Sequence, residues 1–162
     1  MNKPESLKKH LQAAIPELKH NPERLLVFID QGRIRSTAAY GLSFEYSYTL
    51  NIILTDYAGH PDAFAIPLLA WLKLNEPELL TNLERGKDAI QFEADVLDAS
   101  KVDLSVTLPL TERVVVKRQD NGVLSVTHAD EPPAFEELLD LETLRIETPD
   151  GEVIAQWSSP HE

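Results

Sequence analysis

The sequence predicts an α+β protein in which helices pack against an antiparallel β-sheet that carries a long β-hairpin. Residues 43–57, SFEYSYTLNIILTDY, alternate apolar and polar side chains over eleven positions, which is typical of a strand with one buried face. Residues 90–116 repeat this alternation on both sides of the turn sequence DASK, which predicts an antiparallel hairpin. Segments with helical spacing lie outside these strands, as in other α+β folds.

The N-terminal segment has the apolar spacing of a helix. The residues at this spacing are Leu7, Leu11, Ala14, Ile15 and Leu18. Pro16 should stop or kink the helix near Ile15, because its ring clashes with the preceding turn. In HNPER (20–24), Asn21 and Pro22 suit a single helical turn or a bend, and LLVFID (25–30) reads as a short strand. DQGR (30–33) then supplies the residues of a tight turn.

The middle of the chain predicts a second helix and a second long strand. Asp62 is the expected N-cap of a helix over 63–80, which Asn75-Glu76-Pro77 should end or break. Pro67 is tolerable in this helix only within the first turn. Between residues 102 and 116 the apolar side chains recur at even-numbered positions, which predicts a long strand. Pro109 has no N–H and therefore marks an edge or a bulge in it.

Turn signals divide the C-terminal part of the chain. Asp120-Asn121-Gly122 predicts a type I′ turn before a strand at 123–127. A helical turn is expected over 135–141, followed by a small hairpin that turns at Pro149-Asp150-Gly151. We therefore expect an α+β core over residues 1–130, and an acidic connector with a small C-terminal β-hairpin over residues 131–162.

Charge and composition narrow the classes of function. The 162 residues carry a net charge of −12, and residues 119–162 hold eleven acidic side chains against one basic side chain, Arg145. No cluster of Lys and Arg predicts a nucleic-acid partner, and no apolar run approaches the roughly 20 residues of a membrane span. The chain has no cysteine, which excludes disulfides and thiol catalysis and fits the cytosol.

Two clusters of titratable residues are candidates for chemistry. Asp56, His60 and Asp62 share one loop and could form a metal or acid–base site. A second acidic group brackets the DASK turn and consists of Asp95, Asp98 and Asp103. Neither cluster has a nucleophile or a supporting set of ligands at a recognisable spacing. We therefore expect turn and helix capping, with no catalytic residue, metal or cofactor.

Several stretches resemble the tail completion protein R (GpR) family of Peduovirus-type contractile-tailed temperate phages. They are MNKPESLKKHL, NPERLLVFIDQGRI, LSFEYSYTLNIILTDYAG, PLLAWLKLNEPELL, FEADVLDASKVDLSVTLPLTERV and DGEVIAQW. The resemblance covers most of residues 1–130. It implies a tail-terminator-like fold and a structural, non-enzymatic role that completes the head-proximal end of the tail and enables head–tail joining.

The resemblance also implies partners and a location. The expected partners are further copies in a ring, the tail tube protein and the head–tail connector proteins. The expected locations are the virion tail and, during assembly, the cytoplasm of the bacterial host.

The length of the strand at 43–57 leads to a hypothesis about assembly. Its eleven alternating residues outrun an average sheet, so one end should project as an arm whose backbone can join a neighbour. Arg33, Arg35, Tyr46 and Tyr48 are the predicted contact residues. Two alternatives stay open: a small metal-dependent hydrolase that uses the Asp56/His60/Asp62 loop, and an acidic mimic of nucleic acid that inhibits a DNA-binding protein.

Overall fold

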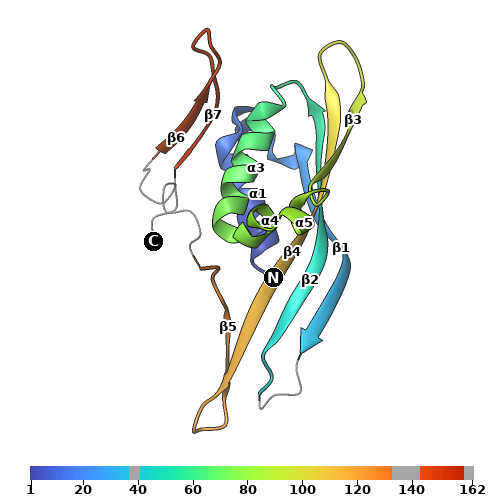
Figure 1. Cartoon of the computed structure of the whole chain (residues 1–162). Coiled ribbons are helices and arrows are strands. Elements are labelled where there is room, and N and C mark those ends of the chain that lie inside the picture. The colour runs from blue at the N-terminus through green and yellow to red at the C-terminus, as the bar shows by residue number, and fades with distance from the viewer. Residues whose placement is uncertain (37–40, 133–142, 159–162) are drawn as a thin grey trace.

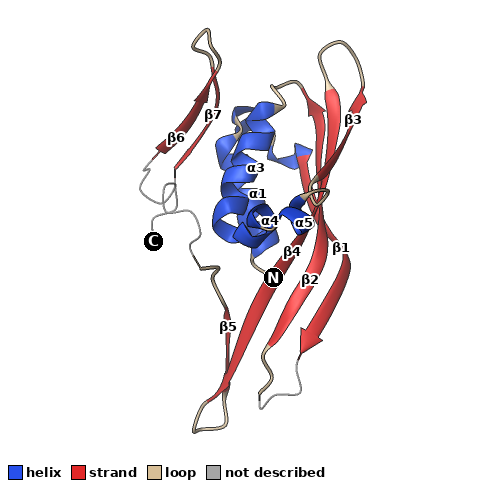
Figure 2. Cartoon of the chain, viewed as in Figure 1, coloured by secondary structure: helices blue, strands red, loops and turns tan. Residues whose placement is uncertain are grey.

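The computed structural model describes residues 1–36, 41–132 and 143–158. The helices are α1 (Lys3–Ala14), α2 (Pro16–His20), the 3-10 turn η1 (Pro22–Arg24), α3 (Asp62–Asn75), α4 (Pro77–Thr81) and α5 (Leu83–Gly86). The strands are β1 (Leu25–Ser36), β2 (Phe44–Tyr57), β3 (Gln91–Val96), β4 (Val102–Arg118), β5 (Leu124–His128), β6 (Thr143–Glu147) and β7 (Val153–Ser158). The predicted α+β class is confirmed, with helices gathered on one side of an antiparallel sheet (Figures 1 and 2).

The main sheet has the strand order β1-β2-β4-β3, and all its neighbours are antiparallel. One edge of β4 is occupied by β2 along most of its length. The opposite edge pairs with β3 over residues 102–107 and with β5 over residues 114–118. The described strands β6 and β7 form a separate two-stranded sheet.

The core lies between α1, α3 and the helix-facing side of the sheet. The predicted alternation in β2 is confirmed, because every second side chain from Tyr48 to Leu54 is buried and those between them are only partly buried. The same holds on β4 for the side chains from Leu104 to Leu110. The helices contribute Leu7, Leu11, Phe64, Leu68, Trp71 and Leu72. Burial of these side chains stabilises the layer by roughly 1.5–3 kcal/mol for each large one.

The sheet is longer than the helical layer. β2 has 14 residues and β4 has 17, and Figure 1 shows their lower ends continuing past the helices beside β1 and β5. We call this extension the arm; it consists of residues 33–36, 44–47, 111–118 and 124–128. The predicted long strands are confirmed, and Figure 1 shows none of the described helices over the lower part of the arm.

The first strand is longer than expected, and the expected turn at residues 30–33 is wrong. β1 runs through DQGR with a β-bulge, since Asp30 pairs with Thr49 and Arg33 pairs with Ser47. Two residues of β1 therefore oppose Tyr48 alone. Gln31 takes a left-handed backbone conformation with φ 49°. This bulge accommodates the extra residue without ending the ladder.

The hairpin turn between β4 and β5 is not of type I′. The Gly122 N–H donates to the Gln119 carbonyl and the Gln119 N–H donates to the Val123 carbonyl. Gly122 has φ +81°, whereas Asn121 is not among the residues with positive φ. Because type I′ requires positive φ at both central residues, this is a type I turn followed by a glycine bulge. The same pattern, with Gly151 at φ +89°, closes the predicted hairpin of β6 and β7.

Proline positions set the helix boundaries largely as predicted. α1 ends at Ala14, Ile15 is extended, and α2 begins at Pro16. α3 differs from the prediction in two respects: Pro61 rather than Asp62 is its N-cap, and Pro67 lies inside the helix. The carbonyl of Pro67 accepts a hydrogen bond from His10 Nε2 at 3.0 Å. The helical turn predicted over 135–141 lies outside the described residues.

The C-terminal hairpin packs against the helices rather than extending the main sheet. Its buried residues Ala155 and Trp157 lie on β7, which contacts α1 and α3. The Trp157 ring meets the His10 ring edge-on, with centroids 5.7 Å apart. The division at residue 130 stays a prediction. None of the described helices is both long and apolar enough to cross a membrane.

Candidate assembly interface

The predicted contact residues lie in or next to the arm, but on different surfaces. Arg33 and Arg35 are exposed on β1, opposite Ser47 and Glu45 of β2. Ser47 and Glu45 have the parity of β2 that faces away from the helices. The side chains of Arg33 and Arg35, which are level with them, are therefore on the outer side of the sheet. Neither arginine forms an ion pair with a described residue. Both are therefore available to a partner.

The two predicted tyrosines differ although they share one side of β2. Tyr46 is half-buried beside Phe44, with ring centroids 4.9 Å apart and the rings nearly perpendicular. Tyr48 is only 3% exposed and packs in the core. Tyr48 lies within the core, whereas Tyr46 is only partly buried against it, a difference that a period of two cannot reveal. Tyr48 is therefore corrected from a contact residue to a residue that holds the base of the arm.

A buried carboxylate on β4 organises the base of the arm. Glu112 is 3% exposed, and its two oxygens accept four hydrogen bonds. Tyr48 Oη donates at 2.6 Å and His128 Nδ1 lies at 2.9 Å. The backbone N–H groups of Asn2 and Lys3 donate at 2.8 and 3.2 Å. Glu112 thus joins β2, β4, the end of β5 and the beginning of α1.

Glu112 caps the N-terminus of α1, where the N-cap residue itself provides no side-chain hydrogen bond. Asn2 is the N-cap of α1 and makes no side-chain cap hydrogen bond. Free N–H groups and the positive end of the helix dipole favour a carboxylate at that position. Burial by itself raises the pKa of Glu112, but the hydrogen bonds from Tyr48, Asn2, Lys3 and His128 outweigh it and hold the pKa below its usual value. The carboxylate is therefore charged at neutral pH.

A second buried carboxylate, Glu76 between α3 and α4, seals the edge of β4. It is 4% exposed and accepts hydrogen bonds from the Thr111 N–H and Oγ1 at 3.2 and 2.8 Å. Lys3 Nζ lies 2.6 Å from Glu76 and 3.0 Å from Glu131. This part of β4 lies between the stretches paired with β3 and β5. The prediction that Pro109 marks an edge is confirmed.

The candidate metal loop is not assembled. Asp62 Oδ2 lies 3.5 Å from His60 Nδ1, but both side chains are half-exposed or more. The Asp56 N–H donates to Asp103 Oδ1. Asp98 accepts hydrogen bonds from Ser100 within its own turn. Within the described ranges, no three His, Asp or Glu side chains are grouped so that they could hold a metal ion. The hydrolase alternative is not supported.

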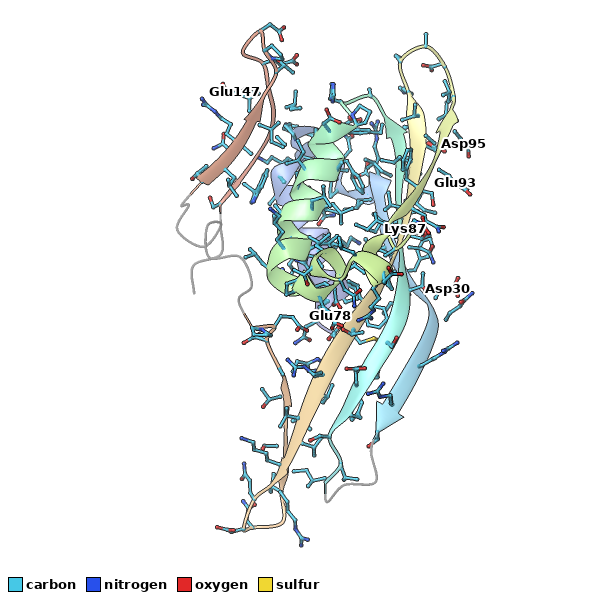
Figure 3. All side chains as sticks on the ribbon, viewed as in Figure 1. Asp30, Glu78, Lys87, Glu93, Asp95 and Glu147 are labelled. Carbon is cyan, nitrogen blue, oxygen red and sulfur yellow. The ribbon has the colours of Figure 1, made fainter. Side chains whose placement is uncertain are left out.

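Three strands of the main sheet, β1, β3 and β5, pair with a neighbour on one side only among the described residues. β1 and β3 are the end strands of the path through the main sheet, and all six residues of β3 are exposed. Figure 3 shows Glu93 and Asp95 projecting from β3 away from the helices. Neither carboxylate forms an ion pair or hydrogen bond with a described residue. Unpaired edges of this kind can bind another strand.

These features define a class of protein: an α+β protein whose antiparallel sheet extends beyond its helices as an arm fixed by buried carboxylates. The family model for the P2 phage tail completion protein R (GpR) matches residues 1–132. The chain belongs to this family, and its role is therefore a structural one in the completion of a phage tail.

A curated relative extends the match to the C-terminal hairpin. The chain is 43% identical over 157 residues to "Tail completion protein R" of Escherichia phage P2, covering 97% of this chain and 99% of the relative. No solved structure matches this chain. The resemblance inferred from the sequence is confirmed, and the nucleic-acid mimic alternative is not supported.

Sequence reasoning missed the buried network. Glu112 occupies a position whose parity matches Leu110 and Val114, both of which face the helices. A charged residue at a core-facing position of a strand requires a partner, so this signal was present in the sequence. Glu76 and Lys3 gave no such signal, because loop and helix-end charges are ordinarily solvated.

Proposed function

We propose that this protein completes the head-proximal end of the tail as a ring of identical copies. The ring ends polymerisation of the tail tube on one face and presents the other face to the head–tail connector. The observation that carries the proposal is the arm, which extends the sheet past the helices and leaves the β1 edge unpaired within the described residues. The name of the relative from phage P2 supports a completing role.

A ring follows from the physics of repeated contacts between identical copies. When one surface of a copy binds a different surface of the next, the contact repeats until the ring closes or a filament grows. A closed ring leaves no copy with a free contact, and it therefore ends growth. The buried bonds of Glu112 and Glu76 give the arm a fixed direction relative to the helices, which closure at a definite number of copies requires.

The proposal includes partners and a location. The tail tube protein and the head–tail connector proteins bind the two faces of the ring, and nucleic acid and membranes are not partners. The protein resides in the virion tail and passes through the cytoplasm of the bacterial host during assembly. Residues 1–130 act as the assembling core, and residues 131–162 as an appended connector and hairpin. No catalytic step is part of this role.

Deletion of the gene in the phage or prophage that encodes this chain tests the proposed function. Lysates are examined by electron microscopy. Headless tails of irregular length beside unattached full heads are expected, because uncapped tubes do not stop growing and offer no surface to the connector. A plasmid copy of the gene should restore whole virions, and a copy with an early stop codon is the control. Normal virions without the protein would refute the function.

A further inference from the structure

We propose that the β1 edge in the arm of one copy pairs with the β3 edge of the next copy, bringing Arg33 and Arg35 against Glu93 and Asp95. The inference rests on the proposed function, because it names the two surfaces that join neighbouring copies in the ring. Both strands end the main sheet. Among the described residues neither has a partner strand on its outer edge, so both edges can accept the hydrogen bonds of an added strand.

The two edges carry opposite charges in the same alternating order. On β1 the order is Arg33-Ile34-Arg35, and on β3 it is Glu93-Ala94-Asp95. All four charged side chains are exposed and form no ion pair with a described residue. Unlike charges placed on facing strands stabilise the pair, whereas like charges oppose it. The charges therefore favour pairing of β1 with β3 of another copy over pairing of β1 with β1 or of β3 with β3.

The charged side chains also face the same side of the sheet. Arg33 pairs with Ser47, and Glu93 pairs with Ser105, both at outer-side positions of β2 and β4. Because side chains alternate along a strand, the apolar residues between and beside the charges face the helix side. These are Ile34, Phe92, Ala94 and Val96. An added strand that continues the sheet matches charge with charge on one side and apolar with apolar on the other.

The apolar side chains at these edges are unusually exposed for their size. Ile34 is 69% exposed, Phe92 is 71% exposed and Val96 is 75% exposed. Contact between the two edges removes part of this apolar surface from water, which favours association. The charges supply selectivity and the apolar side chains supply burial, as in other specific interfaces.

The contact shifts neighbouring copies along their strands. Ile34 pairs with Tyr46 of β2, which pairs with Glu112 of β4, so Ile34 and Glu112 are at the same level. Ala94 pairs with Leu104 of β4. These positions are eight residues apart on β4, a shift of about 27 Å at about 3.4 Å per residue. A closed sheet needs such a stagger, since its strands must tilt relative to the axis. The strands are therefore inclined in the ring.

Two other edge contacts fit less well. In an unshifted contact, Leu26 of β1 would be level with Glu93, which sets an apolar side chain against a carboxylate. The outer edge of β5 is the second alternative acceptor. Its outer-side residues are Ser125 and Thr127, which offer no negative charge to the arginines.

Engineered cysteines test the contact directly, since the natural chain has none. Ile34→Cys and Ala94→Cys are combined in one chain, where the two positions lie on opposite edges of the sheet. When residues 33–35 lie against residues 93–95, positions 34 and 94 are directly opposite each other whether the strands run parallel or antiparallel. Oxidation of purified tails should give a ladder of covalent multimers, whereas each single variant should give no species larger than a dimer.

The control for this experiment moves the second cysteine to β5. Ile34→Cys combined with Val126→Cys should give no ladder in tails. A ladder from this variant, with none from the 34/94 variant, would move the acceptor to β5 and refute the inference. Multimers from neither variant, in tails that contain the protein, would refute edge pairing through β1.

Charge reversal supplies a second test in the gene-deleted phage. Arg33→Glu with Arg35→Glu, or Glu93→Lys with Asp95→Lys, should each abolish the restoration of virions by the plasmid copy. All four substitutions in one chain should restore it, because opposite charges then face one another again at every contact. Lys117→Glu with Arg118→Glu makes the same charge change in the arm away from the β1 edge and should leave restoration intact.

The outcomes separate this inference from the proposed function. If deletion gives headless tails but the double variants restore virions fully, the function stands and the inference is refuted. If deletion has no effect on virions, the function itself fails. Folding of each purified variant is checked by thermal unfolding. An unaltered midpoint with lost restoration supports the inference, and failure of the quadruple variant to restore, although folded, would refute it.

Discussion

The hydroxyl of Tyr48 on β2 donates a 2.6 Å hydrogen bond to the buried carboxylate of Glu112 on β4. The same carboxylate accepts hydrogen bonds from the backbone N–H groups of Asn2 and Lys3, so a single side chain positions the arm relative to the helices. Most predictions about stability follow from this relationship and from the neighbouring Lys3–Glu76 ion pair.

Removal of the Tyr48 hydroxyl tests the value of this hydrogen bond. Tyr48→Phe should lower the free energy of unfolding by about 1.5–3 kcal/mol, because a buried carboxylate loses a donor. Chemical denaturation measures the change. Tyr46→Phe is the matched control, since the Tyr46 hydroxyl has no hydrogen bond with a described residue; its effect should stay within about 0.5 kcal/mol. Equal effects of the two variants would contradict the assigned role.

The charge of Glu112 makes stability depend on pH in the acid range. Its folded pKa lies below the ordinary value of 4.5, so its contribution is complete above pH 4.5 and is lost as the pH falls through the folded pKa. Glu112→Gln should therefore be destabilised most at neutral pH and converge toward the wild type at low pH. Thermal unfolding from pH 7 to pH 3 measures this, and a constant difference across that range would contradict it.

Lys3 holds two carboxylates at the junction of α1, α3 and the segment after β5. Lys3→Met keeps the apolar stem but leaves Glu76 without its cation and Glu131 with Arg113 alone, and breaking a buried ion pair costs about 3–5 kcal/mol. Lys9→Met removes an exposed pair with Glu5, which contributes about 0.3–0.5 kcal/mol. Urea unfolding of both variants gives the comparison, and a Lys3 effect as small as the Lys9 effect would rule out a structural role for the pair.

Trp157 fixes the C-terminal hairpin to the helices. Trp157→Ala should release β6 and β7, because a two-stranded hairpin is marginally stable alone. Limited proteolysis should then cut within residues 131–162 while the core resists, whereas Gln156→Ala on the exposed side should behave as the wild type. Burial lowers the pKa of His10 beside this ring, so the pKa should rise toward 6.5 in the variant by NMR titration. Unaltered cleavage would contradict this attachment.

Local sequence patterns predicted the elements well where a single rule decides. Pro16 ends α1, the period of two gives β2 and β4, and Gly151 closes the last hairpin. The bulge in β1 was missed because DQGR has the composition of a turn. The ladder nevertheless continues beyond Asp30, because β2 offers paired positions from Ser47 to Phe44.

By itself, the sequence determined the α+β class, the parity of the long strands and membership of a family with a structural role. The tertiary structure alone decided which of two tyrosines of equal parity is buried, and that Glu112, Glu76 and Lys3 meet although they lie far apart in the chain. The physical reason is that period and propensity are local properties. The register between strands, and the place where a helical layer ends, depend on packing of the whole chain.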